Sequence, residues 1–450
     1  MSEMDGSGLP SKLLTTLSVA ADKVRGQPFI NVYSHYDADG ISAAAIICKA
    51  LVRAGIEFKT TNFPVLDPPQ METVRNDKPP FFIMTDLGAS YIDQLDSLGC
   101  DGVVLDHHTL GVTETKTITY ANPHLYGIDG MTSGCGATMA FLFAITLDER
   151  NWDLAPVAFA GMIGDRQHLK GMTGLNEYVF ENAKAKGLVR DTPGSFIPYG
   201  DLSTELFTCT DPYICGVTGN PDGVIDLLDE LDIKAGATYD TLTDEERQKL
   251  SSVIAARLIK QGVSRDKLDE TVVTRYLLPT WRTDARALSG ILDACGRNDM
   301  ASVGIAAGMG DPDCLKQGAE IDAESRKNVL MGIRAAEENL TQLENVQWFD
   351  SSESGFTGII CSVVMSYIGD PSKPTIGFNG SEPKAMLSSR ATFPLLERKV
   401  DMAAAMKQAC ESVGGNGGGH KIAAGGSIPR ERRDDFLKEV DRIVGEQKRS

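Results

Sequence analysis

Short apolar segments in the first part of the chain are each followed by an acidic or histidine-bearing turn, and this pattern limits the possible folds. Phe29–Ser34, Phe81–Thr85 and 103–105 have the composition of buried strands. Helix-periodic segments at 41–54 and 136–147 alternate with them. This alternation predicts an α/β fold, with a parallel sheet covered by helices on both faces. Ligands bind at the carboxyl ends of the strands in such sheets, so we expect the polar turns to meet at one edge.

The polar turns supply carboxylates and imidazoles. They are His35-Tyr36-Asp37-Ala38-Asp39-Gly40, Thr85-Asp86, Asp106-His107-His108 and Gly164-Asp165. Clustered carboxylates repel one another and are costly to desolvate, and a bound divalent cation removes that cost. Taken singly, each turn also fits a structural role as a helix cap or a solvated loop.

Taken together, four carboxylates and two imidazoles form a suitable ligand set for two divalent cations. The set is His35, Asp37, Asp39, Asp86, His107 and Asp165. Mixed oxygen and imidazole donors favour Mn²⁺, with Mg²⁺ as the alternative, and the lack of cysteine disfavours structural zinc. Two such cations about 3.5–4 Å apart can activate a water for phosphoryl transfer. Asp106 is expected to orient one of the neighbouring histidine rings.

The C-terminal part carries a second group of candidate residues. A glycine run at 414–419 ends in His420 and lies between a predicted helix at 400–413 and a β-like segment. Consecutive glycine N–H groups can form an anion nest, and a flexible linker is the alternative interpretation. Ser388, Ser389 and Arg390 end another predicted strand, where a guanidinium could bind a phosphate with two hydrogen bonds.

The chain is predicted to have four parts. We assign 1–190 to the metal-binding α/β domain, 191–322 to an acidic and mainly helical insert, 323–344 to a connector helix and 345–450 to a smaller α/β domain. In the insert, Thr243 followed by Glu246 is a capping-box signature for a helix through about Lys260. In the last part, 358–367, 375–378 and 385–391 are β-rich.

Charge and composition exclude some classes of protein. The 450 residues include 44 Lys and Arg against 62 Asp and Glu, a net charge of −18, which argues against a surface basic throughout. Only the last seventy residues, with 13 basic and 10 acidic side chains, form a sizeable stretch whose charge would attract a polyanion. The longest apolar stretch, Ala137–Leu147, is too short to span a membrane. Nine scattered cysteines without a CxxC pair predict reduced thiols and a cytoplasmic location.

The ordered motifs resemble those of the DHH phosphoesterase superfamily, and in particular the RecJ-like single-strand exonucleases of archaeal type. The motifs are HYDADG at 35–40, TDLG at 85–88, DHH at 106–108, GMIGDRQ at 161–167, SSRAT at 388–392 and GGNGGGH at 414–420. The resemblance implies an active-site cleft between an N-terminal DHH domain and a C-terminal DHH-associated domain. It also implies that the insert contacts the GINS replication complex.

The resemblance implies roles for individual residues. Asp37 and Asp39 would each bind one metal ion, Asp86 would bridge the two, and His107 with Asp165 would complete the second site. His108 would face the scissile phosphate. The implied substrate-binding residues are Ser388, Ser389, Arg390, Gly417, Gly418, Gly419 and His420. Bacterial members have aspartate in place of His35, and archaeal relatives tend to have histidine.

The predicted function is a Mn²⁺-dependent exonuclease that acts on single-stranded DNA or RNA in replication or repair. One alternative is a phosphodiesterase for short oligonucleotides or cyclic dinucleotides, which the negative net charge favours because long polyanions need a longer basic track. Another is a replisome scaffold without catalysis. The complete set of acidic ligand positions argues against the scaffold as the sole function, since such a cluster costs stability without metal.

Overall fold

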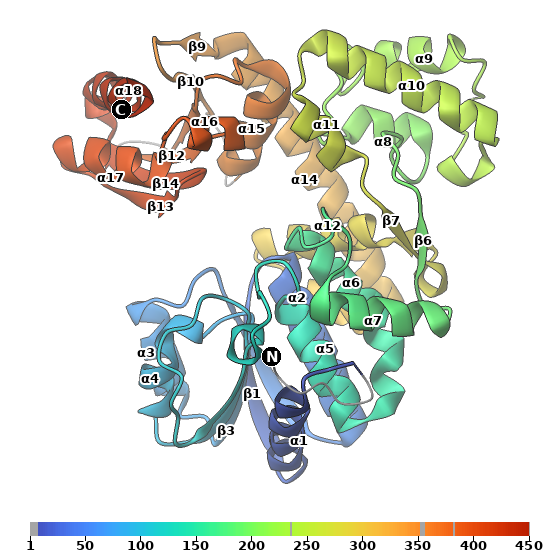
Figure 1. Ribbon diagram of the computed structural model, residues 1–450, viewed down its shortest axis with the longest axis vertical. Coiled ribbons are helices and arrows are strands. Elements are labelled where there is room, and N and C mark those ends of the chain that lie inside the picture. The colour runs from blue at the N-terminus through green and yellow to red at the C-terminus, as the bar shows by residue number, and fades with distance from the viewer. Residues whose placement is uncertain (1–7, 235, 352–355, 381–382, 450) are drawn as a thin grey trace. The chain divides into compact units, whose positions relative to one another are not determined.

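The computed structural model describes residues 8–234, 236–351, 356–380 and 383–449, which form two compact units (Figure 1). Unit 1 contains the chain up to Gly194 together with Val273–Ala323. Unit 2 contains Ser195–Val272 and the chain from Glu324 onward. The mixed α/β architecture predicted from the sequence is confirmed in both units.

Unit 1 is built on a five-stranded parallel sheet with the strand order β2-β1-β3-β4-β5. The strands are β1 (Phe29–His35), β2 (Glu57–Phe63), β3 (Phe81–Thr85), β4 (Asp101–Leu105) and β5 (Ile118–Ala121). Side chains alternate between the faces of the sheet, so Phe81 and Ile83 enter one core while Phe82 and Met84 enter the other. Both faces are therefore buried, as the continuous apolar composition of β3 predicts.

Helices cover the two faces of this sheet unequally (Figure 1). The smaller face packs against α3 (Pro68–Asp77) and α4 (Ile92–Asp96). The larger core is formed with α1 (Ser11–Arg25), α2 (Ala38–Ala54), α5 (Gly136–Leu147), α6 (Ala155–Gly164), α7 (Gly174–Ala185), α12 (Ala285–Arg297) and α13 (Ala301–Gly308). Because α2, α5 and α6 are apolar nearly all round, they lie in the interior of this layer.

The division of the middle part differs from the sequence-based boundaries. The chain leaves unit 1 along β6 (Arg190–Thr192) and returns along β7 (Arg275–Leu278), which pairs antiparallel with β6. Residues after the return, including α12 and α13, contribute Leu288, Leu292 and Ile305 to the larger core of unit 1. The inserted segment therefore ends near 272 rather than at 322, because the apolar face of α12 belongs to the core beside the sheet.

The connector helix is also longer than predicted. The sequence places it at 323–344, whereas α14 spans Pro312–Asn339. The Cys314 N–H donates to the Asp311 carboxylate at 2.9 Å, which caps the start of the helix, and proline is favourable in the first helical turn. Polar residues early in α14 obscured its start because an exposed first half has no apolar periodicity.

Unit 2 contains a six-stranded mixed sheet with the order β13-β14-β12-β11-β10-β9. The strands are β9 (Thr341–Gln342), β10 (Gln347–Asp350), β11 (Thr375–Asn379), β12 (Lys384–Arg390), β13 (Asn416–His420) and β14 (Ala423–Pro429). One face packs against α15 (Thr357–Val363), and the other packs against α17 (Met402–Ser412) and α18 (Arg433–Arg449). The short α16 (Phe393–Glu397) follows β12.

The prediction of a β-rich segment at 358–367 is wrong. The chain there forms α15 and a π-helical turn at Val364–Ile368. Isoleucine, valine and cysteine favour strands on composition, but a helix buries Ile360 and Cys361 against the sheet. Gly377 of β11 allows this close approach, because a Cβ there would lie 2.7 Å from the Thr357 side chain.

The helical segment at 195–272 shares a core with the C-terminal sheet domain. It contains α8 (Leu202–Thr208), α9 (Pro221–Asp229), α10 (Asp244–Gln261) and α11 (Arg265–Thr271). The capping box is confirmed, since Thr243 N–H donates to the Glu246 carboxylate at 2.7 Å and Glu246 N–H donates to Thr243 Oγ1 at 3.2 Å. Gln261 Nε2 donates to the Tyr367 carbonyl at 2.7 Å, which links α10 to the π-helical turn.

Two further sequence-based expectations concern cysteines and membranes. All nine cysteines are free in the structure. Among the described residues, no helix combines the length and the apolar character needed to cross a bilayer.

Candidate active site

The predicted metal ligands of unit 1 lie at the carboxyl edge of its parallel sheet. Asp37 and Asp39 follow β1 at the start of α2, Asp86 follows β3, His107 follows β4, and Asp165 follows α6. Three groups bring their ligand atoms within 4.8 Å of one another: His35, Asp37 and Asp86; Asp39, His107 and Asp165; and Asp86, Asp106, His107 and His108. Asp86 and His107 each belong to two groups, so the ligands form one connected cluster.

His35 lies between two carboxylates. Its Nδ1 is 3.0 Å from Asp37 Oδ1 and 3.5 Å from Asp86 Oδ2, and its Nε2 donates to the Pro64 carbonyl at 3.1 Å. Burial alone lowers the pKa of His35, but the hydrogen bonds with Asp37 and Asp86 outweigh it and raise that pKa to about 11. In the metal-free protein this imidazole therefore carries a proton that a cation in the same position would replace.

Asp86 occupies the centre of the cluster in a strained backbone conformation. Its φ of 54° is in the left-handed region, and its N–H donates to the Leu105 carbonyl at 3.0 Å. One carboxylate oxygen lies 3.2 Å from His107 Nε2 while the other faces His35. Gly136 makes room for it, since a Cβ at that position would lie 2.5 Å from the Asp86 Cβ. Burial raises the pKa of Asp86, but the two histidines outweigh burial and hold it below its usual range.

Asp39 is buried at the N-terminus of α5. Its two carboxylate oxygens accept the Gly136 N–H at 2.7 Å and the Ala137 N–H at 2.9 Å. These N–H groups and the helix dipole favour a negative charge. Burial nevertheless raises the pKa of Asp39, and the nearby carboxylates of Asp86 and Asp165 raise it further. A divalent cation at this point would compensate for that repulsion.

His107 is oriented for ligation through one ring nitrogen. Nδ1 donates to the Gly130 carbonyl at 2.8 Å, which leaves Nε2 facing Asp86 and, at 3.7 Å, Asp39. Such a hydrogen bond fixes the tautomer of a metal-binding imidazole. Asp165 Oδ2 lies 3.7 Å from His107 Nδ1, and burial raises the pKa of Asp165 to about 6, although His107 opposes the shift.

Asp106 has a supporting position beside the cluster. Its buried carboxylate accepts N–H groups of Ala89 and His107, both at 2.7 Å, and its Oδ1 lies 2.8 Å from His108 Nδ1. The side chain of His108 is 50% exposed. Asp106 thus holds the ring of His108 at the solvent-facing side of the cluster and leaves Nε2 of that ring for a ligand.

Three sequence profiles cover most of the chain. The DHH family, N-terminal domain, matches residues 29–162, the DHH-CID domain matches 202–272, and the DHHA1 domain matches 346–446. The uncharacterized protein MJ0831 of Methanocaldococcus jannaschii is 30% identical over 431 residues, which cover 94% of each chain. The chain belongs to the DHH superfamily. Its family places it among the metal-dependent phosphoesterases.

Solved structures show that this DHH protein has a RecJ-like fold. RecJ of Thermus thermophilus with Mn²⁺ matches with a TM-score of 0.59 and 18% identity, over 98% of this chain and 55% of that chain. An exonuclease RecJ bound to manganese matches with a TM-score of 0.56 and 18% identity, over 97% and 95%. CDC45 from Entamoeba histolytica matches with a TM-score of 0.65 and 12% identity, over 96% and 99%.

The cluster of this DHH protein fits divalent metal ions. Its donors are carboxylate oxygens and imidazole nitrogens, which suit Mn²⁺ and Mg²⁺. Several of the carboxylates are buried against one another, which is unfavourable for anions alone. The donor set and its electrostatics therefore agree with the family's metal dependence.

The predicted substrate-binding residues of the DHHA1 sheet divide between its two faces. Ser388 of β12 and Gly418 of β13 both pair with Gly425 of β14. Two residues further along, Arg390 and His420 both pair with Ala423. Residues opposite one another share a face, and so do residues two apart in a strand. Ser388, Arg390, Gly418 and His420 are thus on one face, which α15 covers over β11 and β12.

Ser389, Gly417 and Gly419 are placed on the opposite face. Ser389 is fully buried, and its hydroxyl donates to the Ala424 carbonyl at 3.0 Å. The glycine run is an edge strand rather than a nest-forming turn. Within it, a Cβ at Gly417 would lie 2.6 Å from the Met406 carbonyl oxygen, so α17 requires this glycine for packing. Nothing lies within 4 Å of the position that a Cβ at Gly418 would take.

We predict opposite outcomes for alanine at two neighbouring glycines. Gly417→Ala should lower the melting temperature of unit 2 by several degrees, because its Cβ would meet the backbone of α17. Gly418→Ala should leave the melting temperature within about 1 °C. Thermal unfolding followed by circular dichroism measures both. Equal losses for the two variants would contradict the assignment of Gly418 to the open side of the edge strand.

Arg390 is anchored on the α15 face. Its Nε donates to Ser362 Oγ at 3.2 Å, and its Nη1 donates to the Ser389 carbonyl at 2.9 Å. Gly358 lets the start of α15 approach, since a Cβ there would lie 2.8 Å from Arg390 Nη2. The guanidinium is therefore held in one orientation rather than being a free surface cation.

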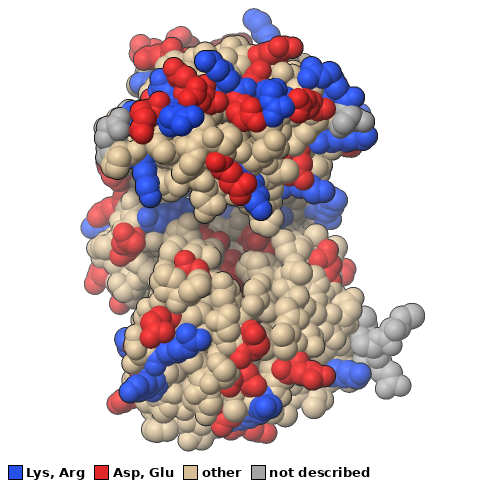
Figure 2. All heavy atoms as spheres, turned by 90° about the vertical axis from the view of Figure 1, so that its left-hand side faces the viewer, with Lys and Arg blue, Asp and Glu red and all other residues tan. Residues whose placement is uncertain are grey.

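Part of the positive charge around this sheet is neutralised by nearby carboxylates. In Figure 2, blue and red side chains are interspersed over the upper part of the molecule. Arg442 pairs with Glu439 at 2.6 Å and with Glu446 at 2.5 Å, and Arg432 pairs with Asp435 at 2.8 Å. These acidic partners offset part of the net positive charge of the last seventy residues.

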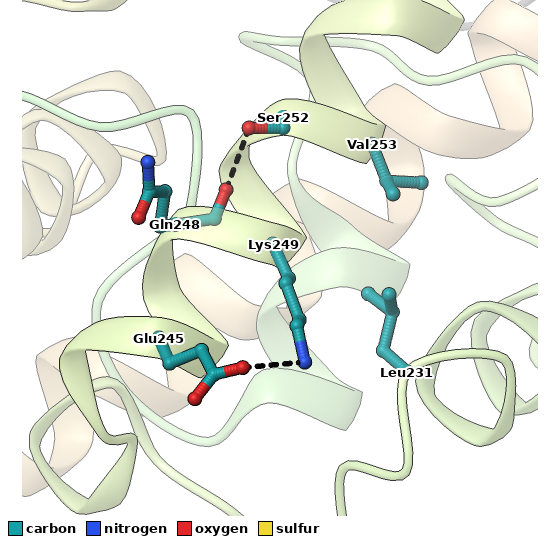
Figure 3. Close-up of a pocket in the computed structure, with 6 residues that line it drawn as sticks. All are labelled: Leu231, Glu245, Gln248, Lys249, Ser252 and Val253. Carbon is teal, nitrogen blue, oxygen red and sulfur yellow. Dashed lines mark hydrogen bonds and ion pairs between the residues drawn. The ribbon is translucent and has the colours of Figure 1, made fainter.

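A cavity on the helical segment has no part in this chemistry. It measures about 470 Å³ and is lined by six residues of α10 and the chain after α9: Leu231, Glu245, Gln248, Lys249, Ser252 and Val253 (Figure 3). Glu245 and Lys249 pair at 2.9 Å, and Ser252 Oγ donates to the Gln248 carbonyl at 2.7 Å. The Glu245 and Lys249 charges and the Ser252 hydroxyl are therefore engaged within α10, and the cavity contains none of the predicted site residues.

Sequence reasoning missed Gln167, although the residue lies in a motif that was singled out. It is buried, and its Nε2 donates to Asp165 Oδ2 at 2.6 Å and to the Gly130 carbonyl at 2.8 Å. Its Oε1 accepts from the Gly134 N–H at 2.9 Å and from Asn176 Nδ2 at 2.7 Å. Gln167 thus joins Asp165 to the carbonyl that orients His107. An amide two residues after the last ligand was the available signal.

Replacing the donating amide of Gln167 should weaken metal binding. In Gln167→Glu, an acceptor oxygen would face the Asp165 carboxylate and the Gly130 carbonyl, so both contacts become repulsive. We expect the Mn²⁺ concentration for half-maximal binding to rise about 10- to 100-fold, the range for a residue that orients ligands. Isothermal titration calorimetry with Mn²⁺ measures the shift.

Gln261→Glu is the matched control for this substitution. Gln261 also donates to two carbonyls, those of Tyr213 and Tyr367, but it lies in unit 2. Its substitution should lower stability without changing Mn²⁺ affinity. An unchanged affinity in Gln167→Glu would show that Asp165 does not depend on this amide.

Proposed function

We propose that this DHH protein is a Mn²⁺-dependent exonuclease that shortens single-stranded DNA or RNA from an end. The observation that carries the proposal is the connected cluster at the carboxyl edge of the sheet, in which Asp86 faces His35 on one side and His107 on the other. A carboxylate shared in this way suits a bridge between two cations. The RecJ-like fold over nearly the whole chain supports the choice of a nuclease.

In this proposal the chain's own residues bind the metal ions and orient the substrate. Two divalent cations would supply an activated water and charge neutralisation for in-line attack on a phosphodiester. Their ligands would be His35, Asp37, Asp39, Asp86, His107 and Asp165. His108, fixed through Nδ1 by Asp106, would offer Nε2 to an oxygen of the scissile phosphate. No residue would form a covalent intermediate, because water is the nucleophile.

The α15 face of the DHHA1 sheet would hold the end of the strand. Ser388, Arg390 and His420 provide polar groups on that face, and Gly418 lets a phosphate or sugar approach the backbone closely. The anchored guanidinium of Arg390 suits a phosphate in a fixed position. Ser389, Gly417 and Gly419 would act through packing rather than contact.

A labelled oligonucleotide tests the function. The purified protein with Mn²⁺ is expected to convert a single strand, labelled separately at each end, into a ladder of products one nucleotide apart on a denaturing gel. The label that gives the ladder sets the polarity. A wild-type protein that binds Mn²⁺ yet cleaves neither long nor short strands would reject the nuclease and favour a replication scaffold.

A phosphodiesterase for short oligonucleotides or cyclic dinucleotides is the second candidate. The local pairing of arginines with acidic residues on the C-terminal helix favours it, because a short substrate needs no continuous basic track. Cleavage rates compared between strands of about three and about twenty nucleotides separate the two candidates. A preference for the shorter strand supports the second.

The helical segment is proposed to bind a replication partner, the GINS complex. The match of 202–272 to the DHH-CID domain and the similarity of fold to CDC45 support this proposal. Co-purification of GINS with the intact chain, and its loss after charge reversal on the exposed face of α10, would test it.

A further inference from the structure

The turn at 36–38, which follows the proposed ligand His35 and contains Asp37, is attached to α12, a helix of unit 1 that sequence reasoning placed outside the metal domain. The attachment uses three residues at the C-terminal end of α12: Asp293, Gly296 and Arg297. Each contacts a different part of the turn at 36–38. None of them belongs to the cluster of proposed metal ligands.

Asp293 binds the first N–H of α2. Its Oδ1 accepts from the Ala38 N–H at 3.2 Å, and this N–H has no acceptor within α2 because it lies in the first turn of that helix. Asp37, the preceding residue, caps the same helix through Oδ1, which accepts from the Gly40 N–H at 3.1 Å. The two carboxylates therefore fix the backbone on both sides of the Asp37–Ala38 peptide.

Arg297 holds the preceding residue, Tyr36. Its guanidinium lies 5.4 Å from the centre of the Tyr36 ring, and Nη1 donates to the Tyr36 hydroxyl at 3.3 Å. Nε donates to Asp293 Oδ2 at 2.5 Å, so one ion pair joins both attachments. The ring of Tyr36 in turn packs edge-on against the ring of His35 at 4.9 Å.

The fit of α12 against the turn leaves no space for adjustment. A Cβ at Gly296 would lie 1.6 Å from the Tyr36 carbonyl oxygen, so the helix backbone touches the turn directly. His35 and Asp37 flank Tyr36, and both face Asp86 or one another within 3.5 Å. A displacement of Tyr36 would therefore move both proposed ligands relative to Asp86.

The Asp293–Arg297 ion pair should affect metal binding and the stability of the fold to different extents. The side chains of Arg297 and Asp293 are 31% and 28% exposed, and an i,i+4 ion pair of this kind stabilises the fold only slightly. Residues that orient metal ligands typically alter metal affinity by about 10- to 100-fold. Loss of this pair should thus affect metal binding far more than unfolding.

We propose that Asp293 and Arg297 are positioning residues, which act through Tyr36 and Ala38 to hold His35 and Asp37 in place for a divalent cation. The inference rests on the proposed metal site, and it adds that metal binding requires α12. It also gives α12 a second role in unit 1, since the helix that fills the core would support the first metal-binding turn as well.

Direct metal binding tests the inference without relying on a substrate. In isothermal titration with Mn²⁺, Arg297→Ala and Asp293→Ala of the full chain should each bind at least about tenfold more weakly than wild type. Their melting temperatures in EDTA should stay within about 2 °C of wild type. Arg297→Lys should recover little of the affinity, because lysine keeps the charge but lacks the planar group that stacks on Tyr36.

Arg442→Ala is the control, since Arg442 also forms an i,i+4 ion pair but lies on α18 in unit 2. It should bind Mn²⁺ as wild type does. Wild-type affinity in Arg297→Ala and Asp293→Ala would overturn the inference while leaving the proposed nuclease intact, because wild-type binding and cleavage are measured separately. A wild type that fails to bind Mn²⁺ would overturn both.

Discussion

Asp86→Asn is expected to lower the rate of Mn²⁺-dependent cleavage by at least about 10³-fold. The substitution keeps the shape of the side chain but removes the charge that faces His35 at 3.5 Å and His107 at 3.2 Å. A bridging carboxylate binds both cations, so its loss weakens both metal sites. A metal centre stabilises the transition state by several kcal/mol, and about 1.4 kcal/mol corresponds to a tenfold change in rate. Single-turnover cleavage of an end-labelled strand measures the loss.

A surface aspartate on the neighbouring strand provides the control for this experiment. Asp101→Asn at the start of β4 removes a 58% exposed carboxylate whose ion pair with Lys23 is 3.3 Å long. It should retain wild-type activity. The melting temperatures of both variants in EDTA separate a loss of metal binding from a loss of the fold. A loss of activity below tenfold in Asp86→Asn would exclude Asp86 as a bridge.

Much of the candidate metal site could be predicted because strand composition indicates where its residues meet. β3 is apolar along its whole length and is followed directly by Asp86, and β1 is followed by the first acidic turn. Parallel strands bring their carboxyl ends to one edge, so spacing along the chain was sufficient to place Asp37, Asp86 and His107 together. No knowledge of the loops was needed for that part.

The full roles of the supporting residues could not be predicted because some of their partners are distant in sequence. Gln167 reaches the carbonyl of Gly130, and Asp293 reaches the N–H of Ala38 across 255 positions. Neither long-range contact leaves a local pattern, since an amide in a turn and a carboxylate on a helix are both compatible with simple solvation. The return of α12 to unit 1 was missed for the same reason.

The DHHA1 sheet shows a different limit of prediction from the sequence. The sequence predicts that the backbone N–H groups of the glycine run bind an anion. In the structure, Gly417 and Gly426 instead allow α17 to pack closely against the sheet. A Cβ at either position would lie within 2.9 Å of Cys410 Sγ on α17. Composition alone cannot separate a glycine required for packing from one left open to a ligand. Strand register separates them, because it assigns Gly418 and Gly417 to opposite faces.

Mn²⁺ should stabilise the protein, and the stabilisation should increase with pH. In the metal-free protein, the carboxylates of Asp37 and Asp86 raise the pKa of His35 to about 11 against burial, which lowers it. A raised folded-state pKa contributes stability that is complete below the unfolded value of about 6.5 and is lost as pH rises toward 11. A cation replaces this proton, so the stabilisation by the cation relative to the metal-free protein increases over the same pH interval.

The difference in melting temperature between samples with Mn²⁺ and with EDTA should therefore be larger at pH 8 than at pH 6. At 1,000 times the dissociation constant, binding contributes about 4 kcal/mol, which corresponds to a shift of several degrees. His35→Gln, which carries no titrating proton, should make that difference less dependent on pH. Titration calorimetry in two buffers of different ionisation enthalpy should also detect proton release on Mn²⁺ binding at pH 7. A difference that is independent of pH, without proton release, would show that metal ions do not displace the proton of His35.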